Sequence, residues 1–298
     1  MSGRPLPQSL RATRVTLLSS RRACLLTCLM GAAICVAQCL GLVLRVRSAG
    51  LGEAPSLGDV WTGVMGGASQ PFPFGSELTA TRPIIIPFGW LSMVLLPCVL
   101  TMRMFREDGY SDACLVAVGS RGSFWVGTAM GCLVVVLLYW SVIVSCCAVV
   151  TIACGGKLAL DASPWLPTVI ALERASLSDP PYHLGASVAL APAVSCAICL
   201  GQLALSLLVG PRVSFLGSVA LVSGSIFAMT PLLPGNLMMA ARSTTYTVAY
   251  PVLVEGGVLL PGIEYRDFLL PAIAFCLSFF LLPIAVVSRR DYLGGSRS

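Results

Sequence analysis

The stretch that decides the fold is FWVGTAMGCLVVVLLYWSVIVSCCAVVTIA, residues 124–153. It contains no Asp, Glu, Lys or Arg, and at about 1.5 Å per residue a helix of this length crosses the hydrocarbon core of a bilayer, which is roughly 30 Å thick. The rest of the chain has the same character, because 56% of its 298 residues are hydrophobic and only 11% are charged. A soluble domain carries about a quarter charged residues. The sequence therefore predicts an all-α integral membrane protein.

Five more apolar runs accompany this one when the chain is scanned with a window of about 19 residues. The six predicted spans cover approximately residues 23–45, 83–102, 124–153, 185–209, 213–234 and 268–287. The first run is too long for the apolar part of a secretory signal and lacks a clear cleavage site, so we expect an uncleaved span. The predicted organisation is then residues 1–22 before the membrane, a transmembrane domain over 23–287 and a tail over 288–298.

The charges of the loops predict the orientation of the spans. With six spans both termini lie on one side, and that side holds twelve arginines against four acidic residues, whereas the other side holds seven basic and nine acidic residues. The positive-inside rule places the arginine-rich side, and with it both termini, in the cytoplasm of a multi-pass protein of the cell membrane. These arginines lie at the ends of spans, facing the lipid bilayer and its anionic headgroups, so the net charge of +6 indicates no nucleic-acid partner.

Single-residue counts exclude several chemistries. The only lysine, Lys157, lies in a Gly-Lys-Leu sequence, so the chain has no Walker-type nucleotide loop. The only histidine, His183, follows a Pro-Pro pair in a predicted loop, which excludes a two-histidine zinc site and disfavours a Ser-His-Asp hydrolase. We expect His183 to be an ordinary interfacial residue. Because no catalytic constellation is present, the sequence predicts a protein that is not itself an enzyme.

The thirteen cysteines resemble a metal or redox signature until they are placed along the chain. Eleven of them lie inside the apolar runs, where cysteine acts as a small hydrophobic residue. Cys196 and Cys199 have the spacing of a redox or metal pair, but they have no second pair and no polar neighbours in the sequence, so a packing role is favoured. The sequence predicts no metal and no cofactor.

The predicted spans contain almost no charged residues, and their strongly polar side chains reduce to Gln38 and Gln202. Ion-coupled carriers and proton pumps keep an ionisable group near the middle of the membrane, because that group binds the driving ion. An intramembrane protease likewise needs a nucleophile with a base, paired aspartates or a metal at membrane depth. Energy for any transport must therefore come from elsewhere.

The longest internal cytoplasmic segment runs from Arg103 to Trp125, with charges at both ends and an amphipathic stretch between them. We expect a short helix on the membrane surface there, ending at the Gly-Ser-Arg-Gly sequence of residues 119–122. Short helices of this kind suit docking to a cytosolic partner.

With these elements in place the chain resembles the permease subunits of type-2 ABC exporters, the ABC-2 group. The resemblance is one of layout, and its parts are an N-terminal surface helix at 5–20, the charged and amphipathic segment from Phe105 to Trp125, a tight turn at Gly210-Pro211-Arg212 and a tail of Ser288-Arg289-Arg290-Asp291-Tyr292. In one place the chain departs from the family pattern, because many members have a lysine after the arginine of the coupling segment and this sequence has Gly127-Thr128 there.

The resemblance implies an ABC-2 permease-like bundle in which residues 1–22 form a cytoplasmic surface helix. It implies an exporter permease that forms the translocation pathway as a dimer with a second copy or a similar permease, while a separate cytosolic ATPase hydrolyses ATP. On this hypothesis the residues that dock the ATPase are Arg106, Glu107, Asp108 and Arg121, and Phe124 and Trp125 position them. The alternative is that these charged residues are solvated topology anchors. The rival interpretation is a non-transporting assembly or immunity factor that binds a partner in the bilayer.

Three segments are expected outside the cell, residues 46–82, 154–184 and 235–267. In the resembling family the last of these holds short helices that dip into the outer leaflet, and the alternative is an exposed loop resting on the membrane. Aromatic residues in the first two segments, among them Trp61, Trp165 and Tyr182, are interpreted as anchors at the outer membrane interface, with a role in gating a substrate as the alternative.

Overall fold

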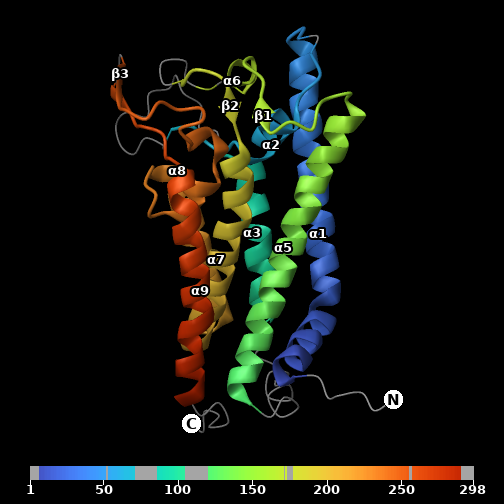
Figure 1. The fold of residues 1–298 in the computed structure, drawn as a ribbon, viewed down its shortest axis with the longest axis vertical. Helices are drawn as coiled ribbons and strands as arrows, with labels where there is room; N and C mark the ends of the chain where they lie inside the picture. Colours follow the sequence, from blue (N-terminus) through green and yellow to red (C-terminus); the bar gives the residue numbers. More distant parts are fainter. Residues whose placement is uncertain are drawn as a thin grey trace.

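The protein is a bundle of apolar helices that carries a folded cap at one end (Figure 1). The computed structural model describes residues 7–51, 53–70, 86–104, 120–170, 172, 177–254 and 257–289. Within these residues the bundle consists of α1 (Gln8–Ser48), α3 (Phe88–Met104), α5 (Arg121–Ala153), α7 (Gly185–Val209), α8 (Pro211–Phe227) and α9 (Arg266–Arg289). The start of α1 and the end of α9 lie at the same end of the bundle, which we call the terminal end.

Four of these helices, α1, α5, α7 and α9, are long and apolar enough to cross a membrane. The other two, α3 and α8, are apolar but have only 17 residues each. Large apolar side chains point outward from the bundle, among them Leu29 on α1, Leu137 on α5 and Phe275 on α9, each at least half exposed. Broad apolar surfaces of this kind are rare on soluble monomers. The chain is therefore an all-α protein whose apolar helices suit insertion into a membrane.

Helix α1 is continuous over 41 residues, so it joins the predicted surface helix and the predicted first span without a break. Close packing against α5 accounts for this. A Cβ atom added to Gly127 would lie 2.3 Å from the Cβ of Ala12, and one added to Gly131 would lie 3.1 Å from the Cγ2 of Thr16. Small residues four apart let two helix backbones approach closely. The first turns of α1 therefore pack against the first turns of α5, and the two helices run parallel.

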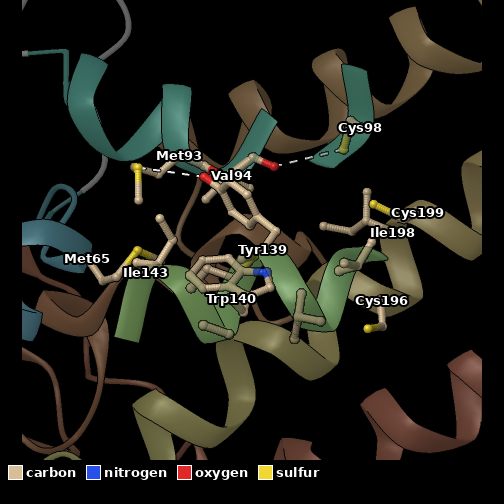
Figure 2. Packing of buried hydrophobic residues seen from close by; sticks show 14 of the residues in the cluster. Met65, Met93, Val94, Cys98, Tyr139, Trp140, Ile143, Cys196, Ile198 and Cys199 are labelled. Atoms are coloured by element: carbon tan, nitrogen blue, oxygen red, sulfur yellow. Dashed lines mark hydrogen bonds between the residues drawn. The ribbon is translucent and has the colours of Figure 1, made fainter. Parts of the chain in front are cut away.

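Helix α5 is the central element of the bundle, with α1, α3, α7 and α9 all in contact with it. The hydroxyl of Tyr139 donates a hydrogen bond to the carbonyl of Met93 on α3 at 2.9 Å, and the indole N–H of Trp125 donates to the carbonyl of Phe280 on α9 at 2.8 Å. Figure 2 shows Tyr139 and Trp140 on α5 between Met93 and Val94 of α3 and Ile198 of α7. These aromatic residues bury large apolar area and place each polar atom of Tyr139 and Trp125 on a backbone acceptor.

Helix α8 ends at Phe227, well before the predicted end of that span at residue 234. The chain beyond it is held in a non-helical path because the side-chain amide of Asn236 donates to the carbonyls of Ala228 and Thr230, at 2.8 and 2.7 Å. The turn that precedes α8 is the single residue Gly210, whose φ of +84° suits glycine, and Pro211 then starts the helix.

The cap is built from the segments predicted as external loops. Its elements are α2 (Leu57–Met65), β1 (Asp161–Ala162), α6 (Leu166–Val169), β2 (Tyr182–His183), the 3₁₀ helices η2 (Pro234–Met238) and η3 (Ala240–Arg242), β3 (Val252–Val254) and β4 (Gly257–Leu259). Strands β1 and β2 pair antiparallel, and so do β3 and β4. The described part of the segment 235–267 contains two short 3₁₀ helices and the paired strands β3 and β4, so it is not a plain loop. That its short helices dip into the outer leaflet stays a prediction.

Two of the aromatic residues interpreted as membrane anchors are buried within the protein. Trp61 on α2 is 1% exposed and its indole N–H donates to the hydroxyl of Ser187 at 3.1 Å, and the ring of Tyr182 packs at 5.0 Å from that of Tyr246. Trp165 is half-buried. The membrane-anchor interpretation is therefore wrong for Trp61 and Tyr182, because partners from distant segments cover both side chains.

The contact between α1 and α5 is open to a test with one methyl group. Replacing Gly127 with Ala puts a Cβ against Ala12 and the backbone of Thr13 and Ser9, and overpacking of this kind destabilises a protein by about 1–3 kcal/mol. We expect Gly127→Ala to lower the temperature at which buried cysteines react with a maleimide fluorophore. The matched control is Gly122→Ala in the same helix, whose Cβ meets nothing within 4 Å. Equal unfolding temperatures for the two variants would contradict the close packing.

Candidate functional site

Of the residues predicted to couple the chain to an ATPase, the described ones lie in the first turns of α5, at the terminal end of the bundle. Arg106, Glu107 and Asp108 lie outside the described residues, and Arg121 is the first residue of α5. Phe124 is half-buried, and Trp125 is 1% exposed and hydrogen-bonded to α9. The described geometry thus gives Trp125 the role of joining α5 to α9, and its buried side chain is not available to a partner.

The start of α1 lies beside the start of α5 at this end. The hydroxyl of Ser123 donates to the side-chain carbonyl of Gln8 at 3.5 Å, and Gly127 faces Ser9 and Ala12. The N-terminal segment and the end of the segment from Arg103 to Trp125 therefore form one continuous surface. The two segments are separate features of the sequence, because no pattern in the sequence indicates that they meet.

The cap is organised around one buried guanidinium, that of Arg242, which is 0% exposed. Its Nε donates to the carbonyl of Ala68 at 2.7 Å, and its Nη2 donates to those of Gln70 and Ile226, both at 3.2 Å. Its Nη1 donates to the carbonyl of Ser225 and to the side-chain oxygen of Asn236. One side chain thus connects the end of α8, the residues after α2 and the start of η2.

None of the described partners of Arg242 is a carboxylate, so backbone dipoles balance its charge. Burial lowers the pKa of the Arg242 guanidinium to about 10, which is still well above neutral pH, and the side chain remains charged. The carbonyls of Ser225 and Ile226 belong to the last turn of α8, and the negative end of a helix dipole favours a cation there. Nearby, the hydroxyl of Tyr265 donates to the carbonyl of Asn236 at 2.6 Å, and burial raises the pKa of this phenol, which stays neutral.

A buried carboxylate, Asp59, fixes the other half of the cap. Asp59 and Ser56 form a capping box at the start of α2, with the Ser56 N–H donating to Oδ2 of Asp59 at 2.8 Å. The N–H and the hydroxyl of Ser163 also donate to this carboxylate, both at 2.7 Å. Three donors from two segments therefore satisfy an ion that would otherwise be costly to bury.

A groove with a cavity volume of about 440 Å³ runs along α1 just below the cap. It is lined mainly by apolar side chains and by Gly41 and Gly63, with the amide of Gln38 and the side chain of Arg45 as its polar members. The side-chain nitrogen of Gln38 is buried and has no hydrogen-bond partner within the described part of the chain. An apolar groove with an unpaired amide and a cation at one end suits an amphipathic molecule.

The other residues singled out from the sequence have structural roles. His183 pairs with Asp161 across β1 and β2, and both side chains are exposed. Cys196 and Cys199 lie in the apolar core of the bundle, where Figure 2 shows them beside Ile198. The described residues that could hold a metal ion are instead Cys35, Cys39 and Cys147, which lie in the apolar runs and for which the sequence predicts a packing role.

Comparison with known proteins gives no further guide: no protein-family model, curated protein or solved structure matches the chain.

The clamp around Arg242 predicts a large loss of stability when the guanidinium is removed. Arg242→Met keeps much of the side-chain length but leaves the buried carbonyls of α8 and of residues 68–70 without a donor, at a cost of about 3 kcal/mol or more. We expect maleimide-monitored unfolding at a clearly lower temperature and cleavage of the cap by a protease under conditions that spare the wild type. The control is Arg266→Met, at an exposed position at the start of α9. If the two variants behave alike, the clamp is not the element that holds the cap.

Proposed function

We propose that the chain is the permease subunit of an ATP-driven exporter of the ABC-2 type. In this proposal all six apolar helices span the membrane, both termini are cytoplasmic and the cap is external. A second copy of the chain, or a similar permease, completes the pathway, and a separate cytosolic ATPase supplies the energy.

The observation that carries the proposal is the contact between the starts of α1 and α5. The resemblance implies that the ATPase contacts two segments, the N-terminal helix and the coupling segment. The start of the first lies beside the end of the second, because the hydroxyl of Ser123 donates to the side chain of Gln8. A single soluble partner can therefore push on both at once. Because Trp125 bonds to the backbone of α9, a push at this surface also reaches the last helix of the bundle.

The interior of the bundle supports an external source of energy. Its buried polar side chains are neutral, and they include Gln202, whose amide donates to the carbonyl of Cys98 at 2.9 Å. Within the described helices no carboxylate or histidine is buried at membrane depth. A change of shape driven by a partner that binds two states differently needs no such group.

The groove along α1 supports an amphipathic cargo. It opens beside exposed apolar side chains of α1, and its polar members, Gln38 and Arg45, lie one behind the other toward the cap. A molecule with an apolar tail and an anionic or hydrogen-bonding head matches that distribution.

Orientation can be tested at the single lysine of the chain. Lys157 is exposed and lies in the cap, so a membrane-impermeant sulfonated succinimidyl ester should label it in intact cells. A lysine-free affinity tag keeps this amine as the only internal target, and Lys157→Arg removes it as the control. Labelling that appears only after the cells are permeabilised would place the cap in the cytoplasm and reverse the proposed topology.

Association with an ATPase is the direct test of the function. The tagged chain is cross-linked in its native membrane, purified in detergent and analysed by mass spectrometry. We expect a soluble ATP-hydrolysing protein in stoichiometric amount. We also expect a double charge reversal, Glu107→Lys with Arg121→Glu, to lower its recovery by roughly tenfold, which corresponds to about 1.4 kcal/mol.

The matched control for this experiment is Lys157→Glu, a reversal of the same kind in the cap, at the far end of the bundle. It should leave the recovery of the ATPase unchanged. If no ATPase is recovered with the wild type while other membrane proteins are, the exporter proposal fails and the interpretation as a partner-binding membrane factor replaces it.

A further inference from the structure

Three thiols meet where α1 packs against α5. Cys35 and Cys39 lie one turn apart on α1, and Cys147 projects from α5 opposite them. The Sγ of Cys35 lies 3.9 Å from that of Cys39 and 3.6 Å from that of Cys147, and all three sulfur atoms lie within 4.8 Å of one another. Each of the three side chains is 0% exposed.

This triangle has the size that a metal ion requires. A metal–sulfur bond of about 2.3 Å places three ligands around one ion at the corners of a triangle with sides of about 4 Å. The sulfur atoms are already at that spacing, so they can coordinate one ion without a shift of either helix. The two helices pack closely next to this point, because Gly31 of α1 lies directly against Tyr139 of α5.

We propose that Cys35, Cys39 and Cys147 form a binding site for a soft metal ion of the Cu(I) class. Thiolates select Cu(I), zinc and iron–sulfur clusters over hard cations. A structural zinc site takes four ligands, and within the described residues this group of ligands contains three. The net charge does not distinguish the two ions, because Cu(I) with two thiolates and one thiol and Zn²⁺ with three thiolates both carry a net charge of −1. The number of ligands does distinguish them, and three ligands favour Cu(I) over Zn²⁺.

The alternative is that these cysteines only fill space. Small apolar residues would fill the same space, and cysteine side chains that only pack need not converge. Among the described residues, these three cysteines are the one group of three or more possible metal ligands whose ligand atoms lie within 4.8 Å of one another. The sequence spacing does not reveal the site, because the third ligand is more than a hundred residues from the first two.

Binding has a defined proton balance. Each thiol that coordinates as a thiolate releases one proton to the solvent, so the affinity for Cu(I) falls as the pH falls. No electron is transferred, because copper enters and remains as Cu(I). The site is independent of the proposed transport function, since it needs only the packing of α1 against α5.

The test uses the full chain purified in detergent with its thiols reduced. It is loaded anaerobically with Cu(I) in the presence of a competing Cu(I) chelator, and copper per chain is measured after desalting. We expect about one tightly bound Cu(I) per chain and an X-ray absorption spectrum with sulfur neighbours only, at about 2.3 Å. This spectrum is recorded on the wild-type protein and does not depend on any variant being folded.

The variants locate the ion. Cys35→Ala and Cys147→Ala should each weaken Cu(I) binding by roughly tenfold or more, a loss typical of disrupted metal sites. Cys24→Ala on the same helix and Cys199→Ala on α7 are the matched controls, since both remove a buried thiol outside the triangle. A monodisperse elution profile in size-exclusion chromatography shows that each variant is folded.

Three results would overturn the site. The first is no bound copper above the level of a Cys35→Ala, Cys147→Ala double variant, and the second is an equal loss of copper in Cys199→Ala. The third is a wild-type spectrum with two sulfur neighbours that is unchanged in Cys147→Ala, because Cys147 would then not be a ligand. A disulfide between Cys35 and Cys147 in the protein purified under reducing conditions, seen as a mass lower by two hydrogens, would likewise replace the metal site by a covalent link.

Discussion

The close approach of α1 to α5 is the constraint on which the other features rest. Gly31, Gly127 and Gly131 each place a backbone directly against a side chain or backbone of the neighbouring helix. Because no water competes for contacts between apolar helices, such packing replaces the hydrophobic driving force that assembles soluble bundles. The same contact places the N-terminal turns of α1 beside Ser123 and brings Cys147 to Cys35. A shift of α1 along α5 by a single turn would break both of these contacts.

The cap solves a different problem, which is how to end apolar helices without leaving backbone groups unpaired. At the end of α8 the carbonyls of Ser225 and Ile226 accept from Arg242, and that of Ala228 accepts from Asn236. A single charged side chain with several neutral acceptors makes every bond charge-assisted, and such bonds are stronger than those between neutral groups. The arrangement also makes the cap cooperative, because removing the guanidinium frees three segments at once.

The helical content and the apolar character of the chain could be predicted from hydropathy, and the predicted stretches 124–153 and 185–209 coincide closely with α5 and α7. The fold of the cap could not be predicted from the sequence. It is held by contacts between distant segments, such as Asp59 with Ser163 and Arg242 with Ala68, and such contacts leave no periodic pattern in the sequence. The cysteine triangle is hidden for the same reason. Contact of Arg106, Glu107 and Asp108 with an ATPase stays a prediction, since these residues lie outside the described part of the chain.

The way the helices are joined limits how the protein can change shape. Side chains of α5 bond to the backbones of α3 and α9, so these helices move as one unit with α5 unless a buried hydrogen bond breaks. The glycine contacts add α1 to the same unit, and a metal ion held by Cys35, Cys39 and Cys147 would cross-link α1 to α5 at the half of the seam nearer the cap. A force applied at the terminal end therefore reaches the cap through a rigid body. Helix α8 belongs to the same unit, because it packs against α3 and α7, and Arg242 joins its last turn to the residues after α2.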